Sequence, residues 1–181
     1  MRQNLPVTGR NLELPKDANI LSTTSPQSHI TYVNPDFIKI SGFTEEELLG
    51  QPHNIVRHPD MPPAAFEHMW STLKSGRSWM GLVKNRCKNG DHYWVSAYVT
   101  PIAKNGSIVE YQSVRTKPEP EQVLAAEKLY AQLRSGKAAR PKLAASFSVK
   151  ILLLIWGSII SSAMAAGMLT DTSISSLLLA T

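Results

Sequence analysis

The stretch ITYVNPDFIKISGFTEEELLGQ, residues 30–51, contains the signals from which the fold can be read. Its first residues, 30–33, are rich in β-branched side chains and alternate in polarity, as in a strand. Asn34 is a favourable N-cap, and Pro35 follows at the first position of a helix, where proline is well tolerated. Gly42 is placed to end that helix. The stretch therefore predicts a strand that leads directly into a short capped helix.

Two further helices are expected before the sheet resumes. Thr44 and Glu47 have the three-residue spacing of a capping box, and Gly50 is placed to close this second short helix. Residues 62–76, PPAAFEHMWSTLKSG, begin with two prolines, carry apolar residues at helical spacing and end at glycine. This pattern predicts a longer helix.

Strand patterns flank the predicted helices on both sides. The run at 20–25 precedes residues 30–33 through the turn signal PQS. Three strand-like runs follow the long helix, at 79–87, 92–103 and 108–116, and the Asn-Gly hairpin signals in KNGD and KNGS separate them. Two strands, several helices and three strands predict an α+β domain, with a five-stranded antiparallel sheet and short helices on one face.

The C-terminal third of the chain changes character. Residues 118–136 predict an amphipathic helix whose apolar stripe suits docking or pairing with a partner helix. Residues 151–169 include 19 consecutive uncharged residues, which as a helix would rise about 29 Å and match the hydrocarbon core of a bilayer. The predicted parts are an N-terminal cap (1–18), an α+β domain (19–117), an amphipathic helix (118–136), a basic juxtamembrane linker (137–150), a transmembrane helix (151–170) and an apolar tail (171–181).

Charge is distributed unevenly and predicts the topology. Residues 1–127 carry 13 basic and 13 acidic side chains, whereas residues 128–181 carry six basic ones against Asp171 alone. Because basic residues accumulate on the cytoplasmic side of a membrane helix, residues 1–150 are expected in the cytoplasm, anchored to the inner membrane. The excess charge does not lie on the folded domain, so a nucleic-acid partner is not expected.

The stretch HNIVRHPDMP, residues 53–62, concentrates polar side chains whose role the pattern leaves open. Arg57 and Asp60 are three residues apart and could form a surface ion pair. His53, His58, Asp60 and His68 lack the spacing of a standard metal site, so no metal is expected. No nucleophile–base pair or carboxylate pair is evident, so the chain is not expected to be an enzyme.

The order of strands and helices, with the segments quoted above and KNGDHYWV (88–95), resembles the PAS fold over about residues 19–117. GQPHNIVRHPDMP and WMGLVKNRCKNGDHYW resemble more narrowly the PAS domain of bacterial aerotaxis receptors, the Aer family. This resemblance implies non-covalently bound FAD whose redox state reports oxygen or energy supply. It also implies a membrane-anchored homodimer with a cytoplasmic PAS domain and a chemotaxis receptor or kinase complex as its partner.

The same resemblance implies which residues hold the cofactor: Arg57, His58, Asp60, Trp79, Asn85 and His53. The residue types suit the task. Arg57 can give two hydrogen bonds to a phosphate or a carbonyl, and Asn85 can donate or accept beside a flavin nitrogen. Asp60 can accept from a ribose hydroxyl or hold a neighbouring side chain in place.

Several alternatives stay open at this level. Trp79 could be a core aromatic residue, Asn85 a solvated strand residue and Cys87 an inert or exposed thiol. His68 on the long helix could ligate a haem, whereas HNIVRHP has no cysteine for an adduct-forming photosensor. The alternative function is a cofactor-free PAS module that serves for dimerisation or interaction.

Overall fold

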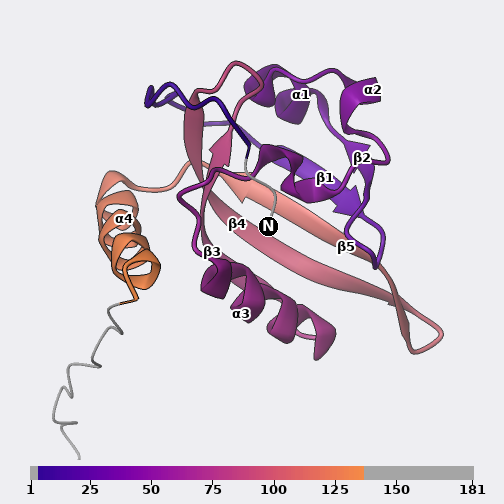
Figure 1. Cartoon of the computed structure of the whole chain (residues 1–181). Helices are drawn as coiled ribbons and strands as arrows, with labels where there is room; N and C mark the ends of the chain where they lie inside the picture. Colours follow the sequence, from indigo (N-terminus) through magenta and orange to yellow (C-terminus); the bar gives the residue numbers. More distant parts are fainter. Residues whose placement is uncertain (1–3, 137–181) are drawn as a thin grey trace, which may run out of the picture. The chain divides into compact units, whose positions relative to one another are not determined.

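The computed structural model describes residues 4–136 (Figure 1). The predicted linker, transmembrane helix and apolar tail lie outside these residues. Within residues 4–136, no helix is long and apolar enough to cross a membrane. The elements are β1 (Ile20–Thr24), β2 (Ile30–Val33), α1 (Pro35–Ser41), α2 (Glu45–Leu48), the 3-10 helix η1 (His53–Val56), α3 (Pro63–Lys74), β3 (Trp79–Arg86), β4 (His92–Lys104), β5 (Ser107–Thr116) and α4 (Pro120–Arg134).

The five strands form one antiparallel sheet in the order β2-β1-β5-β4-β3, as Figure 1 shows. The N-terminal hairpin and the C-terminal strands meet where β1 pairs with β5, with Leu21 opposite Val114. This arrangement confirms the predicted α+β class and the five-stranded antiparallel sheet. The pairing of β1 with β5 brings side chains that are far apart in the sequence onto one continuous sheet face.

The local signals in residues 30–51 act as predicted. The side chain of Asn34 accepts a hydrogen bond from the backbone N–H of Phe37 (3.1 Å), and Gly42 ends α1 with φ at 71°. Thr44 and Glu47 form the reciprocal capping box of α2, with hydrogen bonds of 3.3 and 3.0 Å. These bonds satisfy backbone N–H groups that a helix start would otherwise leave without partners.

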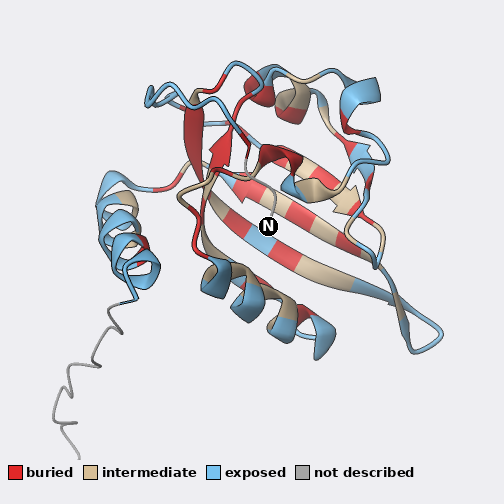
Figure 2. Ribbon diagram, viewed as in Figure 1, coloured by how far each residue is buried: buried red, intermediate tan, exposed pale blue. Residues whose placement is uncertain are grey.

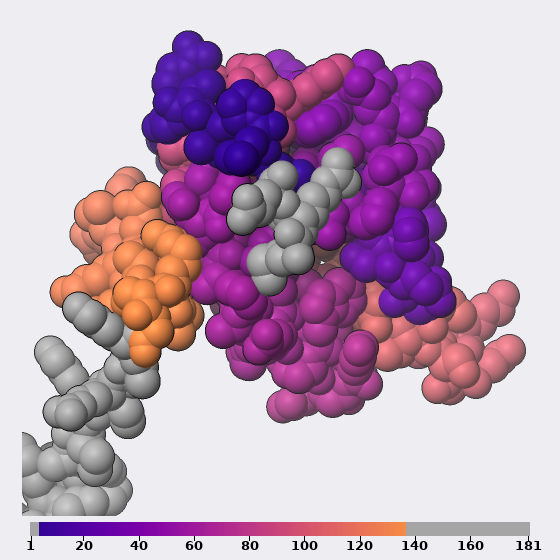
Figure 3. Space-filling model, viewed as in Figure 1, coloured from indigo at the N-terminus to yellow at the C-terminus, as the bar shows by residue number. Residues whose placement is uncertain are grey.

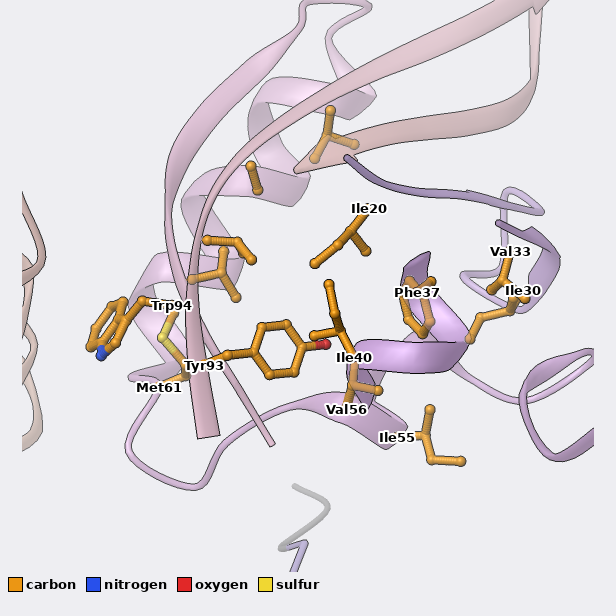
Figure 4. Packing of buried hydrophobic residues seen from close by; sticks show 14 of the residues in the cluster. Ile20, Ile30, Val33, Phe37, Ile40, Ile55, Val56, Met61, Tyr93 and Trp94 are labelled. Atoms are coloured by element: carbon orange, nitrogen blue, oxygen red, sulfur yellow. The ribbon is translucent and has the colours of Figure 1, made fainter. Parts of the chain in front are cut away.

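The core lies between the short helices and the inner face of the sheet. Buried residues alternate with half-buried ones along the second half of β5, as in a sheet with one packed face, whereas residues 92–95 of β4 are all buried (Figure 2). Figure 4 shows the ring of Tyr93 reaching from β4 toward Ile40 of α1, near Phe37 and Val56. Tyr93 and Phe37 are fully buried, so these contacts fasten α1 and η1 to the sheet.

Helix α4 packs against the opposite face of β3 and β4. The hydroxyl of Tyr130 donates to the carbonyl of Leu82 (2.7 Å), and its ring stacks on Trp94 with centroids 6.1 Å apart. Of the predicted apolar stripe, Val123 and Tyr130 pack against the domain, whereas Leu133 is 36% exposed. The short helices therefore cover one face of the sheet, as predicted, and α4 covers part of the other.

The N-terminal segment, residues 4–18, runs along the β3–β4 turn as an extended chain. Backbone N–H groups of Thr8 and Leu12 donate to the carbonyls of Gly90 and His92 at 2.9 and 2.7 Å. In Figure 3 these N-terminal residues, in indigo, lie against the magenta segment that follows β3. The side chain of Asn4 donates to the carbonyl of Arg57 (2.9 Å), so this segment also touches the motif at 53–62.

Candidate functional site

A pocket of about 270 Å³ lies between α3, η1 and the inner face of the sheet. Its walls are largely apolar and aromatic. Helix α3 contributes Phe66, Met69, Trp70 and Leu73, while the strands contribute residues such as Val83 and Val99. The volume is near the lower end of pockets for drug-sized ligands, which hold about 300–1,000 Å³. The pocket can hold a fused ring system, while a longer ligand would continue beyond it.

Trp79 forms part of the pocket wall, and two neighbours fix its orientation. Its indole Nε1–H donates to Nδ1 of His68 on α3 (3.1 Å). The indole covers Gly81, where an added Cβ would lie 2.4 Å from the ring. His68 itself is exposed and does not line the pocket. The haem alternative, which needs His68 as an axial ligand, therefore gains no support from the geometry.

The floor of the pocket is polar and includes side-chain atoms without hydrogen-bond partners. Within residues 4–136, Nδ2 of Asn85, Oγ of Ser113 and Nη1 of Arg115 are buried and have no hydrogen-bond partner, and all three residues line the pocket. Asn85 is 3% exposed, so the alternative of a solvated strand residue is wrong. Buried polar groups without partners are costly and therefore rare in folded proteins. Three of them on one pocket floor indicate a ligand that accepts hydrogen bonds.

Arg115 is the charged centre of this floor. Its Nη2 donates to Nε2 of His53 (2.7 Å) and to the hydroxyl of Ser22 (3.0 Å), and its guanidinium faces the ring of Phe37. It forms no ion pair with any carboxylate of residues 4–136. Burial lowers the pKa of Arg115 to about 10, so the group stays charged at neutral pH.

His53 is neutral beside this cation. Burial, and then the charge of Arg115, lowers the pKa of His53 to about 3. Since an arginine can only donate, Nε2 of His53 is the acceptor, and the proton of the neutral ring lies on Nδ1. His53 lines the pocket, as the resemblance implied. Its imidazole satisfies one donor of Arg115 but supplies no negative charge.

Arg57 also lines the pocket, but it does not pair with Asp60. Its guanidinium lies 4.2 Å from the centroid of the Phe66 ring, and Nη2 donates to the carbonyl of Met61 (2.6 Å). Asp60 instead binds Nζ of Lys84 (2.8 Å). The alternative of an Arg57–Asp60 ion pair is therefore wrong.

His58 and Asp60 lie away from the pocket, on the side of β3 that faces α4. The ring of His58 is buried; its Nδ1 accepts from the backbone N–H of Asp60 (3.1 Å), and its centroid lies 5.5 Å from that of His92. Neither residue is among those that line the pocket. Direct contact of His58 and Asp60 with FAD stays a prediction, while Arg57, Trp79, Asn85 and His53 meet at one cavity.

Among residues 4–136, Cys87 and the other potential metal ligands do not form a second site. Cys87 is buried, its thiol donates to the carbonyl of Ile40 (3.3 Å), and burial raises its pKa to about 11. Of its two predicted states, the inert thiol is therefore the one observed. In the part of the chain that the structure describes, no three His, Cys, Asp or Glu side chains are grouped to hold a metal ion.

Comparisons with known proteins agree with this architecture. Residues 30–115 match the family model described as the PAS fold. The aerotaxis receptor of Escherichia coli (strain K12) is 52% identical over 134 residues, which are 74% of this chain and 26% of the receptor. The nitrogen fixation regulatory protein of Klebsiella pneumoniae is 28% identical over 96 residues, or 52% of this chain and 19% of that protein. The chain thus spans about a quarter or less of these relatives.

Solved structures of light-oxygen-voltage domains share the fold. One, from a study of a flavin analogue, has a TM-score of 0.54 at 22% identity and covers 63% of this chain and 86% of that domain. The dark structure of the Aureochrome1 domain has a TM-score of 0.54 at 20% identity, covering 67% and 88%. At these identities the likeness shows the fold alone. Residues 30–115 form a PAS domain, in a chain similar to the aerotaxis receptor of Escherichia coli over 134 residues.

Proposed function

We propose that this chain is a redox sensor that binds FAD non-covalently in the pocket lined by Trp79, Asn85 and Arg115. The observation that carries the proposal is the pocket floor, where three buried polar atoms, one of them Nη1 of the Arg115 cation, have no hydrogen-bond partner within residues 4–136. The pyrimidine edge of a flavin presents carbonyl and nitrogen acceptors, and its fused rings suit walls built from Phe66 and Trp70. The similarity to an aerotaxis receptor supports the same ligand.

The protein's part in such a sensor is to position the ring and respond to it, while the flavin supplies the electron chemistry. With a flavin bound in the pocket, Arg115 would favour negative charge on the ring, because its own charge has no counter-ion among residues 4–136. Asn85 can donate or accept a hydrogen bond as the protonation of the ring changes. The pocket volume fits the ring system, so the pyrophosphate and adenosine would extend outside the pocket.

The wider role follows from the sequence and the relative. We propose a cytoplasmic PAS domain anchored to the inner membrane through residues 151–170, acting as a homodimer in aerotaxis-type signalling with a chemotaxis receptor or kinase complex. The basic linker and the uncharged run support this topology. A cofactor-free interaction module is the alternative, favoured by Leu124 and Leu129, which are 67% and 43% exposed on α4.

Reconstitution distinguishes the two functions. The purified full chain is incubated with FAD, freed of unbound flavin and compared with the Arg115→Met variant. A sensor retains stoichiometric flavin as wild type and loses it in the variant. A chain that retains none, yet sediments as a dimer, contradicts the sensor and supports the interaction module.

A further inference from the structure

Residues 57–61 contact the pocket on one side and α4 on the other. Arg57 and Asn85 form an isolated backbone bridge, and the backbone N–H of His58 donates to the carbonyl of Lys84 (3.3 Å). The segment therefore lies alongside β3, the strand that carries Asn85 on its pocket face. The side chain of Arg57 reaches the pocket, whereas the carboxylate of Asp60, three residues later, does not.

Asp60 holds the other side of this segment. Its carboxylate binds Lys84 (2.8 Å) and lies 3.5 Å from Nδ1 of His58. Its backbone carbonyl accepts a hydrogen bond from the guanidinium of Arg134, in the last turn of α4. A cavity lined by residues that include Asp60, Lys84, Tyr130 and Arg134 lies at this contact. One residue thus joins β3, the 57–61 segment and the end of α4.

We propose that Asp60 is a positioning residue whose backbone carbonyl holds Arg134 of α4 and whose carboxylate holds Lys84 of β3, so that both elements keep the 57–61 segment, and with it Arg57, at the pocket. The ligand part of this inference rests on the proposed function. Coupling between two sites is reciprocal. If bound ligand stabilises the packing of α4 by a given factor, loss of that packing lowers the affinity for the ligand by the same factor.

The test uses the full chain with Arg134→Gln and Asp60→Asn, and Lys128→Gln as control, since Lys128 is an exposed cation of the same helix. Backbone hydrogen exchange of residues 57–61 and 120–134 is measured without ligand, and FAD affinity is measured separately. We expect exchange at 57–61 to rise roughly tenfold in both test variants, and exchange at 120–134 to rise in Arg134→Gln alone, because Asp60→Asn keeps the backbone carbonyl that Arg134 contacts. FAD affinity should fall roughly five- to tenfold. Arg134→Lys should restore both, and Lys128→Gln should change neither.

The outcomes separate this inference from the proposed function. Unchanged hydrogen exchange at 57–61 in Arg134→Gln overturns the proposed link between α4 and this segment, whatever the FAD affinity is. Faster exchange with unaltered FAD affinity also overturns it, because α4 would then not act on Arg57. A wild-type chain that binds no flavin overturns the proposed function alone. The link between α4 and residues 57–61 is then tested by the hydrogen exchange of that segment.

Discussion

Nη2 of Arg115 lies 2.7 Å from Nε2 of His53, so a buried cation in the PAS domain is held by a neutral acceptor. Arg115 is only 4% exposed, and burying a charge that lacks a counter-charge costs free energy that the fold must recover elsewhere. The pair lies on the floor of the pocket. A ligand that supplied hydrogen-bond acceptors there would offset the free-energy cost of burying the Arg115 charge.

Arg115→Met should separate stability from binding. Removing the buried charge should raise the free energy of unfolding of the ligand-free protein by roughly 1 kcal/mol or more, as when buried ionic groups are replaced by apolar ones. The same change should lower flavin affinity at least tenfold, since a charged hydrogen bond is lost. Urea unfolding and flavin titration check the two effects. Arg77→Met, on an exposed loop residue, is the matched control and should leave both unchanged.

The stability of the ligand-free protein should fall in mild acid. Burial lowers the pKa of His53 to about 3, and burial and then Lys84 lower that of His58 to about 4, from 6.5 in both cases. The unfolded chain therefore binds these protons as the pH falls below 6.5, while the folded chain does not. Each histidine should remove about 1.4 kcal/mol of stability per pH unit between pH 6 and 5, and none above pH 7.

His53→Gln tests the assignment of this pH dependence. Between pH 6 and 5 it should reduce the number of protons taken up on unfolding by about one, so the free energy of unfolding should depend less steeply on pH. His29→Gln is the control, because His29 lies on the surface of the β1–β2 turn. Equal slopes in wild type and His53→Gln would show that His53 is not neutral in the folded protein.

Gly81→Ala should disturb the pocket through Trp79. The new Cβ would lie 2.4 Å from the indole, so the ring must move, at a cost of about 1–3 kcal/mol for overpacking. Flavin affinity and near-UV circular dichroism should both change. In a double-mutant cycle, Trp79→Phe should relieve most of the added cost, because the smaller ring leaves room above residue 81. Additive effects of the two substitutions would contradict the contact.

Much of the fold is local in origin and could be predicted. Asn34, Gly42 and the Thr44–Glu47 capping box specify helix ends through hydrogen bonds to near neighbours, so their effect is visible in the sequence. The pairing of β1 with β5 joins segments about 90 residues apart, and no local signal specifies it. The PAS resemblance implied this sheet as a whole.

The site was only partly predictable for the same reason. Trp79 and Asn85 lie in a distinctive motif, whereas Ser113 and Arg115 alternate with Val114 in an ordinary strand pattern and were missed. The available signal was the inward register of β5, which places Arg115 on the same face as the buried Tyr111. Arg57 and Asp60 diverge because the turn around Pro59 sends them to opposite sides of one segment, which spacing alone does not show.

Cys87 should be chemically inert in the folded protein. With its pKa raised to about 11, on the order of one thiol in a thousand is ionised at pH 8, and the thiolate is the reactive form. Iodoacetamide should therefore label native Cys87 far more slowly than it labels the unfolded chain. Cys87→Ala should leave the redox response of the bound flavin unchanged, and a lost response would show that the thiol takes part in sensing.

The most direct test of the sensor proposal is a visible absorption spectrum of the full chain after reconstitution with FAD and removal of free flavin. The spectrum is recorded before dithionite reduction, after it, and after reoxidation in air. We expect the two-banded spectrum of an oxidised flavin, which bleaches and returns while the flavin stays with the protein. A folded protein that stays colourless, or one that isolates with a sharp Soret band of haem, would contradict it.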